Sequence, residues 1–265
     1  MATALALGAV IGLVLGLTGA GGGSLAVPAL VFGVGLSVPQ ATPIALLAVA
    51  GSALLGTIEG FRRGLVRYRA ASLMAAAGIV VTPLGVWAAH RLPEQILLAL
   101  FAVVLAVVAV RALGWGAVDD AHPAQVPCQM NPATGQLRWH PAVAAVLSAI
   151  GAATGFLSGL LGVGGGFVIV PALRRASDIP LAGVVATSLM VMSIVSTAAF
   201  VAALLHGAEL SARVATPFVV ATALGMIAGR LAARRVAGHH VHRIFGLVLL
   251  VVAIGLLVKA TRAGA

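Results

Sequence analysis

Two copies of a glycine-rich motif are the residues of this chain best suited to binding a ligand. Residues 16–30 read Gly-Leu-Thr-Gly-Ala-Gly-Gly-Gly-Ser-Leu-Ala-Val-Pro-Ala-Leu, and residues 159–173 match them at 10 of 15 positions. Glycine lets a ligand approach the backbone closely, and the first turn of a helix offers free N–H groups at its positive dipole end. The motif therefore favours an anion held by backbone amides. Close packing between helices is the alternative interpretation.

The groups nearest these motifs form the candidate site. Thr42 and Thr187 open the segments that follow the two motifs, each directly after an alanine. Serine and threonine in membrane helices usually bond a carbonyl of their own helix, so this matched pair is a stronger expectation than single hydroxyls such as Ser52 or Thr197. The candidate ligand-binding residues are Gly21, Gly22, Gly23, Ser24, Gly164, Gly165, Gly166, Thr42, Thr187 and Ser188.

Charged and metal-binding residues suggest no competing chemistry. The chain has only six acidic residues, and Glu59, just before the Arg62-Arg63 pair, is interpreted as a salt bridge at a membrane edge rather than a proton relay. The run His239-His240-x-His242 has no cysteine or carboxylate to complete a metal-ligand set. The sequence motifs of serine hydrolases, zinc proteases and nucleotide-binding loops are absent. We expect no enzyme activity, no cofactor and no metal.

The composition indicates that membrane lipid surrounds these motifs. Hydrophobic residues make up 61% of the 265 residues and charged residues 8%, against about 25% charged in soluble domains. The net charge of +10 comes mostly from arginines between or beside apolar runs, a pattern that orients membrane proteins. No nucleic acid is expected as a partner. The single cysteine, Cys128, gives no information on disulfides.

The apolar runs predict an all-α membrane protein. Runs long enough to cross a bilayer, which requires about 20 residues, lie near 41–61, 70–90, 94–114, 141–160, 184–205, 213–233 and 243–259. Residues 3–18 and 24–36 would form helices of only about 24 Å and 20 Å, shorter than the roughly 30 Å hydrocarbon core. These short limbs predict broken or re-entrant hairpins with the glycines at their tips. We expect about 8–10 transmembrane segments, the two glycine-tipped hairpins included.

The duplication divides the chain into a first repeat (residues 1–115), a polar connector (116–140) and a second repeat (141–265). Basic residues crowd one loop of the first half, between 62 and 69, but shift to the next loop in the second half, from 230 to 243. If both clusters are cytoplasmic, the repeats have inverted topologies. The connector is then cytoplasmic and both termini lie outside, although Lys259 and Arg262 run against this orientation.

The paired motifs, each followed by an Ala-Thr segment, resemble the TauE/SafE family of sulfite and organosulfonate exporters. The central run Asn131-Pro132-Ala133-Thr134-Gly135, followed by Arg138-Trp139, is similar to that family's cytoplasmic connector. The resemblance covers essentially the whole chain. By position it adds Gly19 and Gly162 to the candidate site and Pro28 and Pro171 to the motif. Ser24 is replaced by Phe167 in the second copy, so the two tips differ.

The resemblance implies a multi-pass protein of the bacterial inner membrane. The expected function is secondary transport, usually outward, of small sulfur-containing anions such as sulfite, thiosulfate or sulfoacetate, by alternating access between the repeats. An anion channel and a non-transport membrane assembly protein are the alternatives. The sequence leaves the oligomeric state open, a homodimer included. On this interpretation Gly22→Val or Gly165→Val would abolish transport in a protein that still folds.

Overall fold

The computed structural model describes residues 2–19, 22–114, 127–130, 137–208, 210–233 and 238–262 of the chain. These residues form helices joined by short connections, together with two isolated β-bridges. The helices are α1 (Ala2–Thr18), the short 3-10 helix η1 (Gly22–Leu25), α2 (Ala26–Gly33), α3 (Val38–Arg62), α4 (Tyr68–Arg91), α5 (Glu94–Gly114), α6 (Pro141–Leu161), α7 (Gly166–Ala176), α8 (Leu181–Leu205), α9 (Ala212–Ala233) and α10 (Gly238–Arg262).

The seven predicted membrane-spanning segments are confirmed as helices. Within the described residues, α3, α4, α5, α6, α8, α9 and α10 are long and apolar enough to cross a bilayer. Large apolar side chains remain exposed on their outer faces, among them Val110 on α5 and Val251 on α10, with 65% and 69% of their surface accessible. Water would disfavour so much exposed apolar surface, whereas lipid does not. The chain is therefore an all-α, multi-pass membrane protein.

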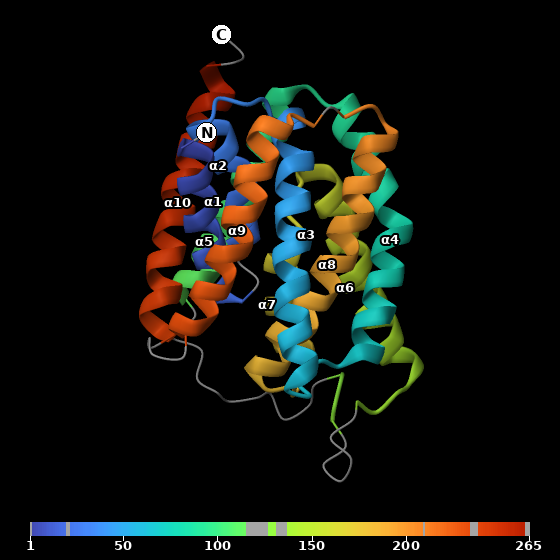
Figure 1. Cartoon of the computed structure of the whole chain (residues 1–265). Helices are drawn as coiled ribbons and strands as arrows, with labels where there is room; N and C mark the ends of the chain where they lie inside the picture. The colour runs from blue at the N-terminus through green and yellow to red at the C-terminus, as the bar shows by residue number, and fades with distance from the viewer. Residues whose placement is uncertain are drawn as a thin grey trace.

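The glycine motifs lie at the turns of two helical hairpins. In the first, α1 ends at Thr18 and the chain returns through η1 and the eight-residue α2. In the second, the 21-residue α6 is followed by the 11-residue α7. At about 1.5 Å per residue, α2 and α7 are too short to span a bilayer, while α6 is long enough. The first hairpin enters from the top of Figure 1 and the second from the bottom.

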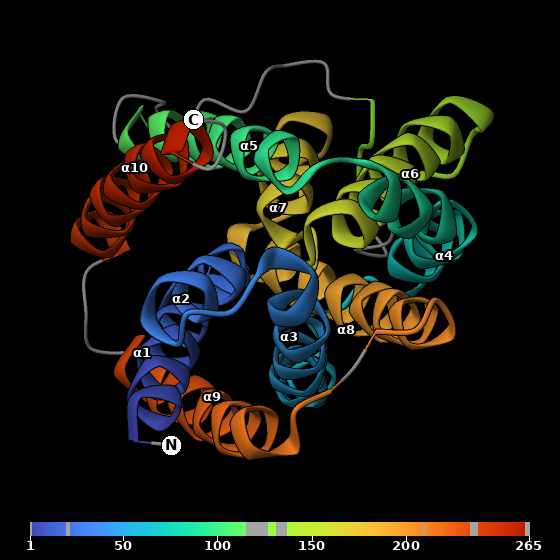
Figure 2. The ribbon, with the colours of Figure 1, turned by 90° about the horizontal axis from the view of Figure 1, so that it is seen from above.

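Equivalent helices of the two halves run in opposite directions. In Figure 1, α3 descends from top to bottom, whereas α8 ascends. Both contain 25 residues, so Val38 corresponds to Leu181 with an offset of 143 residues. The contacts between helices also pair up when the halves are exchanged: α1 packs on α9 as α6 packs on α4, and α3 packs on α9 as α8 packs on α4. Viewed from above, α3 and α8 lie centrally and α5 with α10 form one outer side (Figure 2).

Stripes of glycine set the contact between the halves. Along α1 and α6 a glycine recurs every fourth residue and lies against the backbone of α9 or α4. A Cβ added at Gly12 would lie 2.1 Å from the Thr222 carbonyl oxygen, and one at Gly155 would lie 2.1 Å from that of Gly78. Only glycine permits such close approach of two helices. The glycines in these stripes are Gly8, Gly12 and Gly16 on α1, and Gly151, Gly155 and Gly159 on α6.

The described parts of the connector pack beneath the second hairpin. The Cys128 amide donates to the carbonyl of Ala176 at 2.8 Å, and the Met130 amide donates to the Asp178 carboxylate at 2.8 Å. Met130 and Leu137 form an antiparallel bridge on either side of residues 131–136, which lie outside the described residues together with the predicted turn at 131–135. Burial raises the pKa of the Cys128 thiol, and the nearby Asp178 carboxylate raises it further.

Candidate functional site

The tips of the two hairpins meet in the interior of the protein. Gly22, Gly23 and Ser24 are buried, as is the whole stretch from residue 161 to 167. A Cβ added at Gly23 would lie 3.2 Å from the carbonyl oxygen of Val163 in the other motif. The structure thus brings the two predicted motifs together, although they are about 140 residues apart in the chain. Gly21 lies outside the described residues.

The two central helices flank this junction. A Cβ at Gly23 would lie 3.3 Å from the Val49 side chain of α3 and 3.4 Å from the Met192 side chain of α8. Val49 and Met192 occupy equivalent positions, 143 residues apart. A Cβ at Gly164 would lie 2.8 Å from the Ser196 hydroxyl oxygen. The junction therefore lies between the middle of α3 and the middle of α8.

The second tip has the backbone conformation that an amide site needs. Gly162, Gly164 and Gly165 have φ angles of 71°, 70° and 65°, in the left-handed region that favours glycine. Among the described residues, no group accepts a hydrogen bond from the amides of Val163, Gly164 or Gly165. Gly166 begins α7, so the positive end of that helix dipole points at the same place. Buried amides without partners are rare in folded proteins, so these three are available to a ligand that accepts hydrogen bonds.

Most of the predicted hydroxyl groups are already bonded within the protein. The Thr42 hydroxyl donates to the Val38 carbonyl at 2.9 Å, and the Ser188 hydroxyl donates to Val184 at 2.8 Å. The Thr187 hydroxyl accepts the Arg67 amide at 3.1 Å, in the loop before α4. A hydroxyl carries one proton, so Thr42 and Ser188 have none left for an anion. This is the bonding usual for serine and threonine in membrane helices.

Three other serines provide the buried hydroxyls that the sequence interpretation did not select as a group. Ser52, Ser158 and Ser196 are fully buried, and their hydroxyl oxygens have no hydrogen-bond partner among the described residues. Ser196 is the one that faces Gly164. The sequence interpretation names its neighbour Thr197 and not Ser196. Counting in steps of four from the candidate Ser188 would have selected Ser196, since residues i and i+4 share a helix face.

The threonine match predicted from sequence is out of register. A Cβ at Gly162 would lie 2.6 Å from the Thr42 side chain, but a Cβ at Gly19 would lie 2.3 Å from Val185. With the offset of 143 residues, Val185 is the counterpart of Thr42, and Thr187 lies two residues further along. The Ala-Thr pairs are thus similar in sequence without being equivalent in space. The second repeat places an apolar side chain where the first places a hydroxyl.

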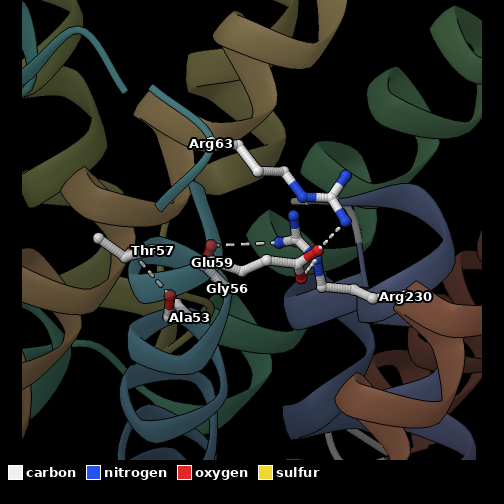
Figure 3. Close-up of polar contacts among 6 residues, drawn as sticks. All are labelled: Ala53, Gly56, Thr57, Glu59, Arg63 and Arg230. Atoms are coloured by element: carbon white, nitrogen blue, oxygen red, sulfur yellow. Dashed lines mark hydrogen bonds and ion pairs between the residues drawn. The ribbon is translucent and has the colours of Figure 1, made fainter. Parts of the chain in front are cut away.

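Glu59 forms the salt bridge predicted for it and a second one that the sequence did not suggest. One carboxylate oxygen lies 2.6 Å from Arg63, and the other lies 2.6 Å from the Nε atom of Arg230 on α9. Arg230 also donates to the carbonyl of Gly56 at 3.3 Å. Figure 3 shows the two guanidinium groups converging on the one carboxylate. The network ties the lower end of α3 to that of α9, across the two halves.

A cavity of about 610 Å³ approaches the junction from the opposite end. It lies between the upper ends of α3, α4 and α8, and its wall includes Thr42 and Gly159. Thr42 in turn contacts Gly162, so the cavity ends one side chain away from the second tip. Among the described residues, no cluster of three or more histidine, cysteine or acidic side chains could hold a metal ion. The site as described can bind a small anion through neutral donors.

The structure corrects the glycine substitutions proposed from sequence. A Cβ at Gly22 would lie 2.4 Å from the Leu15 backbone nitrogen, and one at Gly165 would lie 2.2 Å from Thr154 at a positive φ. Valine at either position would therefore distort the hairpin, and loss of transport would not report on the site alone. Gly23 is a better probe, because its nearest contacts would be 3.2–3.4 Å and its φ is not positive.

Comparison with known proteins gives one consistent result. The family model described as "Sulfite exporter TauE/SafE" matches residues 4–256. Two proteins of Xylella fastidiosa, both described as "Probable membrane transporter protein", are 32% (strain 9a5c) and 31% (strain Temecula1) identical to the chain, covering 93% of it and 91% of each relative. No solved structure is significantly similar. The chain belongs to the TauE/SafE sulfite exporter family and is a membrane transporter.

Proposed function

We propose that the protein is a secondary transporter that exports small sulfur-containing anions, such as sulfite, thiosulfate or sulfoacetate, through a site at the junction of the two hairpin tips. The observation that carries this proposal is a set of buried donors that have no partner within the part of the chain that the structure describes: the amides of Val163, Gly164 and Gly165 and the hydroxyl of Ser196. The family description supports the class of substrate.

The chemistry of the anion suits these donors. A sulfonate or sulfite group presents three oxygen atoms that accept hydrogen bonds, and buried donors that lack partners gain most from such a ligand. The amino-terminal end of α7 contributes the positive end of a helix dipole. These donors are neutral, and the site needs no buried arginine to bind an anion. The empty site therefore carries no unpaired charge when its access switches from one side of the membrane to the other.

Alternating access is the mechanism that we propose for this site. The cavity leads to the junction from the upper end, while the Glu59–Arg230 ion pair joins α3 to α9 at the lower end. This combination fits a transporter in which one side is open and the other is closed. In the opposite state the ion pair would separate and the upper cavity would close around the site.

We propose that the lower end faces the cytoplasm of a bacterium and that the protein lies in the inner membrane. Arg62 and Arg63 end α3, and Arg174 and Arg175 end α7, so both pairs lie at that end with Arg230. Positive residues favour the cytoplasmic side. The connector is then cytoplasmic and both termini lie outside.

Counterflow in liposomes tests this function. Purified protein would be reconstituted into vesicles loaded with unlabelled sulfoacetate, and entry of labelled sulfoacetate would be measured with sulfite, thiosulfate, sulfate, lactate and chloride as competitors. A transporter gives saturable exchange that sulfur oxyanions compete for, whereas a channel gives conductance without exchange. Absence of both exchange and conductance for every anion would overturn the proposal in favour of an assembly role.

Gly23→Ala is the site variant for this assay. The added methyl group would fill the space between the two tips, since its nearest neighbours are Val163, Val49 and Met192 at 3.2–3.4 Å. We expect counterflow to fall at least about tenfold, because an anion displaced by the methyl group would lose at least one charge-assisted hydrogen bond to the second tip. Gly51→Ala on α3 is the matched control, because a Cβ there meets nothing within 4 Å. Equal activity of both variants would exclude the tip junction as the site.

A further inference from the structure

Two histidines face one another in the upper cavity. His90, near the end of α4, and His206, directly after α8, both line it, and their ring centroids are 5.6 Å apart. The Nδ1 atom of His90 lies 2.8 Å from the carbonyl oxygen of Val86, and that of His206 lies 2.9 Å from Ala202. Each Nδ1 therefore carries the proton that bonds its own helix. The Nε2 atoms are left to meet a ligand, as acceptors when the ring is neutral and as donors when it is protonated.

At the lower end of the protein, the position equivalent to His206 carries a permanent positive charge. With the offset of 143 residues between α3 and α8, His206 corresponds to Arg63 and Ala202 corresponds to Glu59. Gly159 contacts Val86 as Gly16 contacts Arg230, so Val86 takes the place of that arginine. The lower end is thus held by ion pairs, while the same positions at the upper end carry no acidic partner. A positive charge on His206 would have no carboxylate at the equivalent position to neutralise it.

Two further polar side chains of the cavity wall can donate hydrogen bonds. Gln40 accepts the Ser37 amide through its side-chain oxygen, which leaves its amide nitrogen as a donor, and Ser211 contributes a hydroxyl. No acidic side chain lines the cavity among the described residues. A wall that offers hydrogen-bond donors and no acidic side chain is suited to an oxyanion and not to a cation.

From this geometry we propose that His90 and His206 form a second, proton-dependent binding site for a small oxyanion or sulfonate, in the upper cavity and outside the hairpin junction. This site rests on the proposed function in one respect: it would hold the same anion on its way to or from the junction. Protonation of the imidazoles supplies Nε2–H donors and positive charge, so anion binding and proton uptake strengthen each other.

Other charged groups near the cavity do not account for such a pH dependence. Arg91 lies over the Trp87 ring at 4.3 Å and Arg213 is in the first turn of α9; arginine stays protonated throughout the range concerned. The Glu94 carboxylate accepts the Val38 amide at 3.2 Å. Glu209 lies outside the described residues. Histidine is the side chain that ordinarily changes charge between pH 5 and 8.

Calorimetric titration with methanesulfonate tests the site, because the charge of this anion does not change over that range. We expect the wild-type protein to bind methanesulfonate roughly tenfold more tightly at pH 5.5 than at pH 8, the gain that one charge-assisted hydrogen bond gives. The double variant His90→Gln/His206→Gln should lose this gain. His140→Gln, at an exposed histidine before α6, is the control and should behave as the wild type.

A fixed charge separates an electrostatic role from a structural one. His206→Arg introduces the residue found at the equivalent position 63, so we expect tight binding at pH 8 and a flat pH profile. The proposal is overturned if the double variant keeps the pH dependence of the wild type, or if His206→Arg binds no more tightly at pH 8. Counterflow distinguishes the two proposals. If the double variant exchanges the anion with the pH profile of the wild type, the transport function is supported and the histidine site is excluded. If the double variant loses pH-dependent binding but the wild type shows no exchange, the histidine site is supported and the transport function is excluded.

Discussion

Ser196 and Ser188 give opposite expectations from the same substitution. Both are buried on one face of α8, two turns apart, but the Ser188 hydroxyl donates to Val184 while that of Ser196 has no partner among the described residues. Alanine at 188 removes a hydrogen bond and should cost about 1 kcal/mol of unfolding free energy. Alanine at 196 removes an unsatisfied buried hydroxyl and should leave stability unchanged or raise it by up to about 1 kcal/mol.

The order reverses for anion binding. If the Ser196 hydroxyl donates to the anion, its contribution of about 1.5–3 kcal/mol makes Ser196→Ala bind roughly 10- to 100-fold more weakly. Ser188→Ala should bind as the wild type, because its proton is committed to the helix. Thermal unfolding in detergent gives the stability, and its shift with added methanesulfonate at pH 8 gives the affinity.

One pattern of results would exclude the Ser196 hydroxyl as a ligand donor. If Ser196→Ala loses about as much stability as Ser188→Ala and binds the anion with wild-type affinity, then the hydroxyl has a protein partner and faces no ligand. Measuring both variants at pH 8 keeps the upper-cavity histidines from masking the effect. Because the two substitutions are chemically identical and lie on one helix, differences in helix propensity cancel.

Two further predictions concern packing and the connector. Gly155→Ala should destabilise the protein by about 2–3 kcal/mol, since its Cβ would overlap the Gly78 carbonyl. Gly51→Ala should stabilise it by up to about 1 kcal/mol, because a Cβ there meets no neighbour and alanine favours helix. Thermal unfolding of both variants measures these changes. The Cys128 thiol should react with iodoacetamide at least about tenfold more slowly at pH 8 than in the unfolded chain, because burial and Asp178 raise its pKa and so lower the thiolate fraction. Asp178→Asn should speed the reaction severalfold; an unchanged rate would exclude the carboxylate as a cause.

The helices and the glycine-tipped hairpins could be predicted from local properties of the sequence. Seven apolar runs of about 20 residues became seven helices, because a chain in lipid must satisfy its backbone hydrogen bonds within each segment. The glycine motifs lie at the hairpin turns, where Gly19 in the first motif and Gly162, Gly164 and Gly165 in the second have positive φ angles that favour glycine. The salt bridge between Glu59 and Arg63 was also predictable, since the two residues are four apart on one helix face.

The tertiary structure alone decided which groups remain available to a ligand. Whether a hydroxyl can donate a hydrogen bond to a ligand depends on its neighbours in space. The Thr42 hydroxyl already donates to Val38, whereas that of Ser196 has no partner among the described residues. The register between the repeats follows from helix packing, so Val185 replaced Thr187 as the counterpart of Thr42. His90 and His206 are 116 residues apart and meet only because α4 and α8 pack together. The local sequence determines which segments form helices in lipid. The packing of the two halves decides which of the described hydrogen-bond donors have no partner within the protein.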